Sequence, residues 1–550
     1  MARRLPIDRN EASSARPEIS GLMLNLAVAA FIMAAYNNTF WSNAYTIFGG
    51  NVFRTAVFGA VVWALTLFTI SLLGFRWFQK PVLAGLLLLS AATSYYMDNL
   101  GVMIDRDMIR NIMLTTVNES RHLMTASFIT QLTAWGLLPA ALVLWVRVRP
   151  QGFLRNLFGW VGTVAVSLVL FFGLLYSDFK AYSAAVREHR ELMGSYQPGA
   201  PLAGAFKYVK MITRNTNVVV QPLGADATSG PYLAAAEKPV LTVIMLGETA
   251  RAQNFGLNGY ARQTTPELAA RNVINFANVS ACGTSTAISV PCMFSPFGHD
   301  GYSYERAVAS ENLLDVLSHA GVVVEWWDNN TGDQGNAKRV TSHRLKAEDD
   351  PAACASGECT DDIFLPIIQR TMETMTEDTV LVMHMIGSHG PSYYLRYPPA
   401  FEAFTPACHT SEFADCTAEE IVNAYDNTIL YTDHILGQAI DMMAAQDRVL
   451  PAMLYVSDHG ESLGEGGLYL HGAPYFMAPE EQTHVPMVLW MSSAFQEALR
   501  IDPECLGALE QTPISHDNIF HTVLGLMDIR TTVRDATLDL SGACRSEQPA

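Results

Sequence analysis

Long apolar runs that contain almost no charged residues occupy the first third of the chain. A helix needs roughly 20 residues to cross the hydrocarbon core of a bilayer. Five runs approach that length, at about 21–41, 52–73, 81–97, 123–146 and 157–176. Because these stretches lack a charged face, the buried core of a soluble helical protein explains them poorly. The pattern therefore predicts an α-helical membrane domain of five spans over residues 1–180.

Lysine and arginine residues in the flanking segments indicate the orientation of these runs. Basic residues collect on the cytoplasmic side of membrane proteins. They precede the first run and lie in the loops after the second and fourth runs, whereas the loop at 42–50 has none; they are Arg3, Arg4, Arg9, Arg16, Arg76, Lys80, Arg147, Arg149 and Arg155. We therefore expect a cytoplasmic N-terminus, and an odd number of spans then places everything after about residue 177 outside the cytoplasm.

The segments that border these runs have mixed polarity. Residues 98–122 combine apolar and polar side chains at helical spacing, which predicts a helical segment at the membrane surface. Residues 181–238 predict a bridge, which begins with an amphipathic helix at 182–193 and continues as a connector containing proline, glycine and serine.

After about residue 239 the pattern changes to short apolar runs of β type separated by helical stretches. The runs are PVLTVIML (239–246), GVVVEWW (321–327), TVLVMHMIG (379–387), PAMLYVSD (451–458) and HVPMVLWM (484–491). Buried parallel strands have this continuous apolar character, and their alternation with helices is typical of α/β folds. We therefore expect residues 239–550 to form an α/β domain with a mostly parallel sheet.

The two parts of the chain also differ in charge. Residues 1–180 contain 14 Lys and Arg against 8 Asp and Glu, whereas residues 181–550 contain 21 against 45. Nucleic-acid binding requires Lys and Arg to replace phosphate counterions, so the acidic second part argues against a nucleic-acid partner. The same charge favours divalent cations.

All eight cysteines follow residue 280. An even number of cysteines confined to one part of a chain indicates disulfides in an oxidising compartment. The sequence alone does not determine the pairing. The grouping favours three short loops, 282–292, 354–359 and 408–416, and leaves one pair; the cysteines are Cys282, Cys292, Cys354, Cys359, Cys408, Cys416, Cys505 and Cys544. A zinc cluster is the alternative, but the chain contains no Cys-x-x-Cys motif.

Potential metal ligands follow three of the predicted strands. Glu248 follows the run VIMLG, His389 follows HMIGS, and Asp458 and His459 follow MLYVS, with His471 twelve residues later. Sites in open α/β sheets lie at the carboxyl ends of the strands. Carboxylate oxygens with imidazole suit Zn²⁺, with Mn²⁺ as the alternative.

A cluster of hydroxyls lies between two cysteines in ACGTSTAISVPCMFSP (281–296). Thr284, Ser285 and Thr286 stand where a loop can turn into a helix, and exposed N–H groups at such a turn favour a phosphoryl group. A threonine hydroxyl becomes a good nucleophile only beside a metal or a base. The alternative for this cluster alone is an ordinary helix N-cap.

Four long motifs occur in order along the second part of the chain. They are GETARAQNFGLNGYARQTTP (247–266), NVSACGTSTAISVPCMFS (278–295), HMIGSHGPSYYLRYP (384–398) and SDHGESLGEGGLYLHGAPY (457–475). Together they resemble the lipid A phosphoethanolamine transferases, which include the mobile colistin-resistance proteins. The resemblance extends over essentially the whole chain. It implies an alkaline-phosphatase-like (sulfatase-like) hydrolase fold, and a monomer in the bacterial inner membrane with its catalytic domain in the periplasm.

The resemblance also implies the reaction. Phosphoethanolamine would move from phosphatidylethanolamine to a phosphate of lipid A through a covalent intermediate on Thr286, giving resistance to cationic peptides such as polymyxin. One Zn²⁺ would be bound firmly, with room for a second; the ligands of the first are Glu248, Thr286, Asp458 and His459. His389 and His471 would serve the substrate side, as general acid and base, or a second metal.

Further residues match positions that the family uses to bind substrate. Asn111, Thr115 and Glu119 would hold the ethanolamine head group, and their spacing of four puts them on one helical face. His384 matches a nearby histidine, for which an inward-facing strand position is the alternative. The loop DNNTGDQGNAKRV (328–340) departs from the family: Thr331 keeps a hydroxyl, a disulfide is lost, and Gln334 replaces a lysine. Either Lys338 or Arg339 could supply the missing charge.

Other functions fit the sequence less well. A sulfatase needs a Cys/Ser-x-Pro-x-Arg site, and the segment 289–293 lacks the arginine. A glycerol-phosphate transferase of the lipoteichoic type would lack the disulfides and the HGPSYY and LYLHG motifs. A non-enzymatic membrane sensor with a degenerate domain would lack a metal-ligating residue, and none of the metal-ligating residues is missing from this sequence. Transfer to another periplasmic glycan, such as a core sugar or a glucan, stays open as an alternative.

Overall fold

The computed structural model describes residues 16–214, 218–354 and 358–546. The side chains of residues 118 and 119 are also outside this description. Contacts divide the chain into two compact units. The first contains the residues up to Asn99 together with Ala126–Leu202, and the second contains Leu100–Thr125 together with the residues from Ala203 onward.

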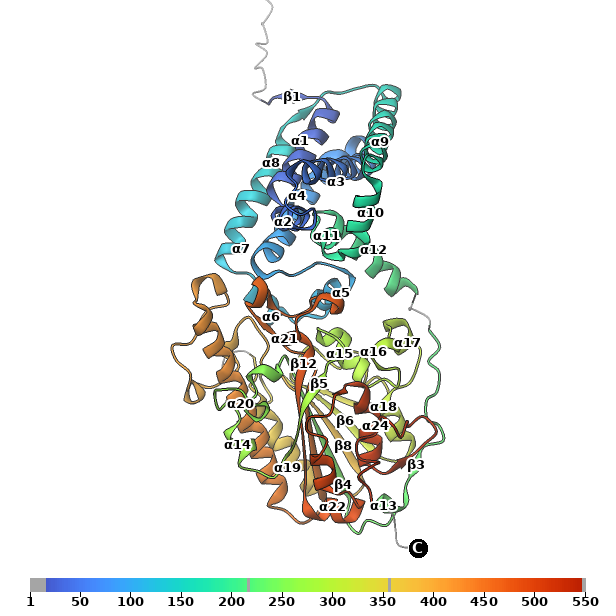
Figure 1. Cartoon of the computed structure of the whole chain (residues 1–550), viewed down its shortest axis with the longest axis vertical. Helices are drawn as coiled ribbons and strands as arrows, with labels where there is room; N and C mark the ends of the chain where they lie inside the picture. The colour runs from blue at the N-terminus through green and yellow to red at the C-terminus, as the bar shows by residue number, and fades with distance from the viewer. Residues whose placement is uncertain (1–15, 215–217, 355–357, 547–550) are drawn as a thin grey trace, which may run out of the picture. The chain divides into compact units, whose positions relative to one another are not determined.

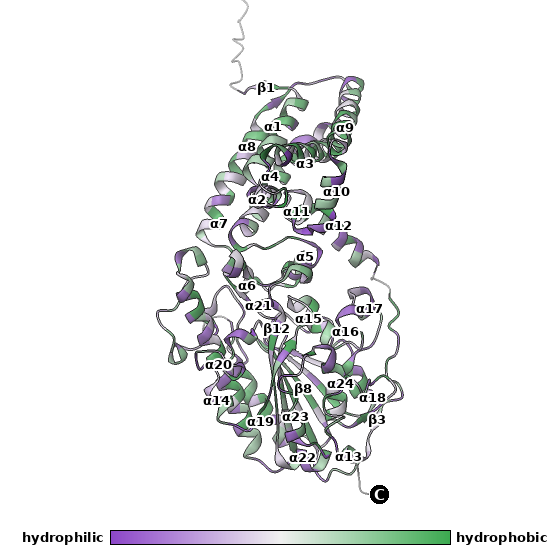
Figure 2. Cartoon of the chain, viewed as in Figure 1, coloured by the Kyte–Doolittle hydropathy of each residue, from purple (hydrophilic) through white to green (hydrophobic). Residues whose placement is uncertain are grey.

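The first unit is helical. Its helices are α1 (Gly21–Ala35), α2 (Asn38–Ile47), α3 (Val52–Leu73), α4 (Gln79–Leu100), α7 (Ala126–Gln131), α8 (Leu138–Trp145), α9 (Phe153–Tyr176), α10 (Phe179–Glu188), α11 (Arg190–Gly194) and the start of α12 (Gly199–Arg214). A π-helical turn, Leu132–Leu137, joins α7 to α8. Figure 1 shows these helices, and Figure 2 shows that apolar residues predominate along α3 and α9.

Three helical stretches of the described residues are long and apolar enough to cross a membrane. They are Val52–Leu73, Ala126–Trp145 and Phe153–Tyr176, and the pair α1–α2, bent by 70°, makes a fourth if it counts as one span. The remaining expected span, 81–97, lies within α4, which is long enough but ends in the polar sequence SAATSYYMDN. The span count of five and the cytoplasmic N-terminus, which lies outside the described residues, stay predictions.

The second unit is built on an eight-stranded sheet of order β13-β5-β12-β9-β4-β8-β6-β7. The strands are β4 (Val240–Gly247), β5 (Ile274–Ser280), β6 (Val323–Asp328), β7 (Thr341–Arg344), β8 (Thr379–His384), β9 (Leu450–Ser457), β12 (His484–Met491) and β13 (Ile514–Ser515). Strands β9, β4, β8, β6 and β7 run parallel, and β13 runs parallel to β5. The mostly parallel sheet expected from the sequence is confirmed.

Strand β12 corrects one expectation. The run 484–491 was grouped with the parallel strands, but β12 is antiparallel to both β9 and β5. A parallel return requires a long crossover, usually a helix. Between β9 and β12 the chain forms only the small hairpin of β10 (Ser462–Leu463) and β11 (Tyr469–Leu470) and short helical turns, including α21 (Glu480–Thr483). The chain therefore re-enters the sheet in the opposite direction.

Both faces of the sheet are covered, as the continuous apolar character of β4 requires. Its residues alternate between two hydrophobic clusters: Val240, Ile244 and Leu246 pack into one, and Leu241, Val243 and Met245 into the other. The first cluster includes α18 (Leu313–His319), α22 (Ser493–Leu499) and α24 (Asp517–Leu526). The second includes α19 (Leu365–Thr374) and α20 (Ala418–Ala444). The helices flank the sheet in Figure 1.

Shorter elements complete the second unit. They are β3 (Thr228–Ser229), α13 (Pro231–Ala234), α14 (Pro266–Ala269), α15 (Thr286–Met293), α16 (Gly298–Gly301), α17 (Tyr304–Val308), α23 (Pro503–Gly507) and β14 (Ile529–Arg530). Four disulfides join Cys282 to Cys292, Cys354 to Cys359, Cys408 to Cys416 and Cys505 to Cys544. The pairing that the sequence favoured is the one observed.

The segment 100–125 belongs to the second unit although it lies between helices of the first. It contains α5 (Arg106–Leu114) and α6 (Val117–Leu123). The Asp105 carboxylate caps α5 by accepting bonds from the N–H groups of Asp107 and Met108, both at 2.9 Å. His122 Nε2 lies 3.1 Å from Glu358 Oε2. The contact between His122 and Glu358 joins a segment expected at the membrane surface to the α/β unit.

Candidate active site

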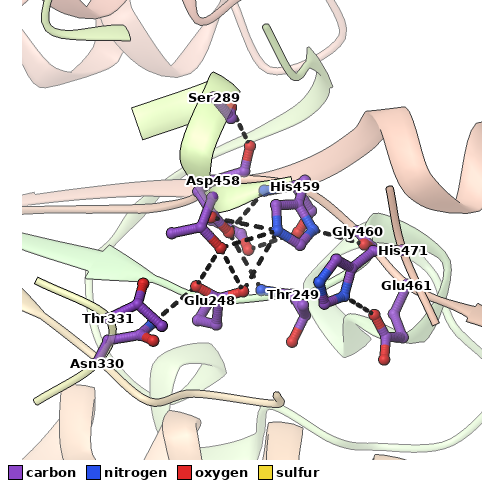
Figure 3. A network of polar contacts seen from close by, with 12 residues as sticks. Glu248, Thr249, Ser289, Asn330, Thr331, Asp458, His459, Gly460, Glu461 and His471 are labelled. Atoms are coloured by element: carbon purple, nitrogen blue, oxygen red, sulfur yellow. Dashed lines mark hydrogen bonds and ion pairs between the residues drawn. The ribbon is translucent and has the colours of Figure 1, made fainter. Parts of the chain in front are cut away.

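Three predicted metal ligands meet at the carboxyl edge of the sheet. Glu248 follows β4, and Asp458 and His459 follow β9, the parallel neighbour of β4. One ligand atom from each lies within 4.8 Å of the others, and all three residues are buried (Figure 3). The parallel register places these strand ends side by side, as the sequence predicted.

The hydrogen bonds of His459 direct one ring nitrogen at the two carboxylates. Its Nδ1 lies 2.9 Å from the carbonyl oxygen of Gly460, to which it can only donate. Its Nε2 lies 3.3 Å from Glu248 Oε1 and 3.4 Å from Asp458 Oδ2. A metal-binding histidine commonly donates its other ring N–H to a carbonyl or carboxylate in this way.

The charges of these residues suit a cation. Burial raises the pKa of Asp458 to about 7, with the neighbouring Glu248 adding to the rise. Burial would lower the pKa of His459, but the charges of Asp458 and Glu248 outweigh it and raise this pKa to about 10. Burial would raise the pKa of Glu248, but its bond to His459 holds it below the usual value. Asp458 Oδ2 has no hydrogen-bond partner among the described residues. Two buried carboxylates, one of them with an unused oxygen, therefore fit a divalent metal ion.

Thr286 is the hydroxyl that faces this group. It is the first residue of α15, and its Oγ1 donates toward the carboxylate of Glu248, at 3.0 Å from Oε2 and 3.2 Å from Oε1. Oγ1 also lies 3.4 Å from His459 Nε2. The other two hydroxyls do not share this position: Thr284 donates to the Ala473 carbonyl at 2.6 Å, and Ser285 is the N-cap, without a side-chain capping bond.

The histidines expected on the substrate side lie next to the metal ligands. The ring centroids of His471 and His459 are 4.5 Å apart, and those of His471 and His389 are 5.3 Å apart. His471 Nδ1 lies 2.8 Å from Glu461 Oε2, and the Tyr393 hydroxyl donates to Glu461 Oε1 at 2.7 Å. Because a carboxylate only accepts, Nδ1 carries the proton and Nε2 is the nitrogen left for chemistry.

Two residues that support the site were missed in the sequence. Glu461, in the motif DHGES, is fully buried behind His471. Asn330 donates to Glu248 Oε2 at 2.7 Å and to the Met385 carbonyl at 2.9 Å. Asn330 comes two residues after β6, so the rule that sites gather at strand ends could have identified it.

His384 occupies the inward-facing strand position that was its alternative interpretation. It ends β8 and is fully buried, with Nδ1 2.9 Å from Asp328 Oδ1. Its Nε2 lies 3.4 Å from the side-chain nitrogen of Asn330. His384 therefore reaches the metal group through Asn330, and no direct bond to it is seen among the described residues.

The residues expected to bind the head group are less completely placed. Asn111 and Thr115 lie at the end of α5, where the Thr115 hydroxyl donates to the Asn111 carbonyl at 2.8 Å. Neither makes a hydrogen bond to the metal group in the described part of the chain. Glu119 lies in α6, and its side chain is outside the described structure.

The contacts of Thr331, Gln334, Lys338 and Arg339 describe the loop 328–340, which departs from the family pattern. Thr331 Oγ1 accepts a bond of 2.9 Å from Gln334 Nε2. Arg339 makes a two-bond contact with Asp315, with both distances 2.6 Å, so its charge is already paired. Lys338 is exposed and has no ion pair among the residues described here, so it is the unpaired cation of this loop.

Comparisons with known proteins identify the family. Residues 241–529 match the Sulfatase family model, and residues 62–212 match the model for Phosphoethanolamine transferase EptA/EptB. The chain is 37% identical to Phosphoethanolamine transferase EptA of Escherichia coli (strain K12), over 96% of this chain and 98% of that protein. It is 34% identical to Phosphatidylethanolamine transferase Mcr-1 of Escherichia coli, over 95% and 98% respectively.

A solved structure matches both units. The integral membrane protein lipooligosaccharide phosphoethanolamine transferase A (EptA) from Neisseria meningitidis superposes with a TM-score of 0.92 at 34% identity, covering 96% of this chain and 100% of that chain. The match confirms a helical membrane domain combined with a sulfatase-like α/β domain, as the sequence resemblance implied. The chain belongs to the phosphoethanolamine transferase family of the alkaline phosphatase superfamily, whose members include EptA and Mcr-1.

Proposed function

We propose that this chain transfers phosphoethanolamine from phosphatidylethanolamine to a phosphate of lipid A through a covalent intermediate on Thr286. The observation that carries the proposal is the Thr286 hydroxyl, which points at Glu248 inside a buried group that fits a metal. The names of the relatives, among them a Kdo(2)-lipid A phosphoethanolamine 7''-transferase of Salmonella typhimurium at 28% identity, support the substrate class.

The metal in this proposal is one Zn²⁺ ion held by Glu248, Asp458, His459 and Thr286. When bound, zinc would stabilise the charge of phosphoryl oxygens and lower the pKa of the coordinated hydroxyl. His471 lies beside His459, and His389 lies beside His471, so these two histidines are the residues that would hold a second ion.

The protein's own residues would divide the proton transfers between them. The Thr286 hydroxyl donates to Glu248, which takes the proton as the oxygen attacks phosphorus. As the bond between phosphorus and the diacylglycerol oxygen breaks, the doubly protonated ring of His471 donates its Nε2 proton to that oxygen, and Glu461 stabilises the positive charge of the ring before the transfer. In the second half, His471 Nε2 takes the proton of the attacking lipid A phosphate, the bond between phosphorus and Thr286 Oγ1 breaks, and Oγ1 recovers the proton held by Glu248. His389 is the alternative acid and base.

The proposal includes the placement of the protein. We assign residues 1–180 to a five-span membrane domain, 181–238 to the bridge and 239–550 to the catalytic domain. The protein would be a monomer in the inner membrane of a bacterium, with a cytoplasmic N-terminus and a periplasmic catalytic domain. Both substrates are membrane lipids. An added ethanolamine amine would offset phosphate charge on lipid A and weaken its attraction to cationic peptides such as polymyxin.

Mass spectrometry of lipid A tests the proposal directly. Lipid A from cells that express the protein should carry a phosphoethanolamine adduct, and lipid A from cells that express Thr286→Ala should not. An adduct confined to core sugars or to periplasmic glucans would establish the alternative acceptor. No adduct on any of these, in cells with correctly folded protein, would refute the proposed reaction.

A further inference from the structure

A cavity of about 320 Å³ in the second unit lies apart from the reacting groups. Its walls come from α5, α12, α15, α17 and the loop 331–339, and none of Glu248, Thr286, Asp458, His459, His389 or His471 lines it. Two residues connect it to the active site. Pro291 belongs to the helix that Thr286 begins, and Thr331 follows Asn330, which bonds to Glu248.

One wall of the cavity carries a buried positive charge. The Arg110 side chain, on α5, belongs to a residue that is only 6% exposed. Its guanidinium stacks on the Tyr304 ring at 4.4 Å, and no ion pair to Arg110 is found in the part of the chain that the structure describes. The other aromatic neighbour is uncharged, because burial raises the pKa of Tyr302. A buried guanidinium without an anion is costly.

The acidic residues near Arg110 are already engaged. Asp107, one turn away on α5, makes two bonds to Arg106 at 2.7 and 3.1 Å. Glu311 binds the His319 ring at 2.8 Å and accepts from the Leu223 N–H at 2.9 Å. Asp333 accepts from two N–H groups of its own loop. Since Arg339 is paired with Asp315, Arg110 and Lys338 are the cations of the cavity lining that have no ion pair among the described residues, and the carboxylates of Glu311 and Asp333 are held by other donors.

The rest of the lining includes a set of apolar residues. They are Leu114, Met211, Ile212, Val220, Phe297 and Val308. A cavity lined both by two cations without ion pairs and by hydrocarbon matches an anionic group attached to an apolar body. Guanidinium binds phosphate through paired hydrogen bonds, and a lysine on a flexible stem adds a second charge.

We propose that this cavity binds a phosphoryl group of a lipid, and that this phosphoryl group is not the one that reacts at Thr286. The site would hold a second phosphate of the acceptor or the head group of a neighbouring anionic lipid, and the two share the same chemistry. The assignment to a lipid rests on the proposed function, whereas the assignment of an anion to Arg110 and Lys338 does not. Arg110 is the residue that defines the ligand class.

Titration calorimetry of the full-length protein in an uncharged detergent tests this site. The probe is octyl phosphate, a phosphate monoester with an eight-carbon chain, with inorganic phosphate and octyl glucoside as the two comparison ligands. Wild type should bind octyl phosphate saturably, inorganic phosphate at least about ten-fold more weakly because the apolar lining is unused, and octyl glucoside only by partition into the detergent.

The variants separate the two charges. Arg110→Gln should weaken octyl phosphate binding by a factor of about ten or more, as expected for the loss of a charge-assisted pair, and Lys338→Gln by a smaller factor of about three. The control is Arg370→Gln, which removes an exposed arginine from α19 and should leave binding unchanged. Lys338 is exposed, so its variant decides the question if Arg110→Gln fails to fold.

Three results would overturn the inference. The first is unchanged octyl phosphate binding by folded Arg110→Gln, or by Lys338→Gln if Arg110→Gln does not fold. The second is an equal loss of binding in Arg110→Gln and Arg370→Gln. The third is inorganic phosphate binding as tightly as octyl phosphate, which would make the ligand a free ion. For the distinction between lipids, nanodiscs that contain lipid A are compared with nanodiscs that contain phosphatidylglycerol. Because binding requires no turnover, Thr286→Ala should bind octyl phosphate like wild type. If the protein transfers no phosphoethanolamine but still binds octyl phosphate in a way that depends on Arg110, the proposed reaction is refuted and the anion site is not.

Discussion

Substitution of the three adjacent hydroxyls should separate the nucleophile from its neighbours. Thr286→Ala removes the only one of the three that contacts the metal group, so transfer should fall to background. Thr286→Ser keeps the hydroxyl and loses one methyl group, which leaves a measurable rate. Both proteins should still bind metal, because Glu248, Asp458 and His459 are intact.

The neighbouring hydroxyls should affect stability rather than chemistry. Thr284→Ala removes a hydrogen bond of 2.6 Å and leaves the Ala473 carbonyl without that donor, a cost of about 1–3 kcal/mol in unfolding free energy. Ser285→Ala should cost less than the roughly 1 kcal/mol typical of an N-cap, because no capping bond is formed here. Both variants should retain transfer within about a factor of ten of wild type, since 1.4 kcal/mol in a barrier is ten-fold in rate.

The assay is incubation with phosphatidylethanolamine followed by peptide mapping. A phosphoethanolamine adduct should appear on Thr286 within the loop closed by Cys282 and Cys292, and thermal melts should rank the variants by stability. An adduct on Thr284 or Ser285 would refute this reasoning. So would near-normal transfer by Thr286→Ala.

Three further predictions concern the surrounding groups. Glu461→Gln should lower the transfer rate at least about ten-fold with metal content unchanged, because a charge-assisted bond to the histidine becomes a neutral one; a wild-type rate would contradict the role of Glu461. Exhaustive chelation should abolish transfer, and Glu248→Ala should lose zinc in elemental analysis; full activity without metal would refute the mechanism. Burial would raise the pKa of Glu358, but its bonds to His122 and Arg396 lower it to about 2. A carboxyl group whose pKa is lower in the folded state than in the unfolded state stabilises the fold at pH values above its unfolded-state pKa. This stabilisation is lost as the pH falls through the folded-state pKa. Glu358 should therefore contribute roughly 2–3 kcal/mol above about pH 4.5 that disappears toward pH 2. Thermal melts of Glu358→Gln should lack that loss, and a slope equal to that of wild type would contradict it.

The ligands of the metal group could be predicted because strand ends are local in sequence. A continuous apolar run identifies a buried strand, and the parallel arrangement puts Glu248 and Asp458 at the same edge. The direction of β12 was not predictable from its apolar run, since parallel and antiparallel buried strands look alike. The information lay in the connection before it, which has no crossover helix among the described residues.

The supporting residues could not be found by the same reasoning. Asn330 contacts Glu248 across 82 residues of sequence, and Glu461, although only ten residues from His471, is enclosed by Tyr393, which lies 68 residues away. A polar residue beside a motif is usually solvated, and only tertiary packing reveals one that is fully buried. Arg110 was missed for the same reason, because the helical pattern of 98–122 suggests an exposed polar face.

The electrostatics of the site explain why the same residues should bind metal and also lose it in acid. Two carboxylates and one imidazole are buried together, and without a cation the pKa of Asp458 rises to about 7 and that of His459 to about 10. The group therefore retains protons near neutral pH when no metal is bound. A divalent ion replaces those protons, so its binding releases them and weakens as the pH falls. Thr286 donates to Glu248, one of these carboxylates. A divalent ion bound by the carboxylates would therefore also lie close to the Thr286 hydroxyl and would lower its pKa.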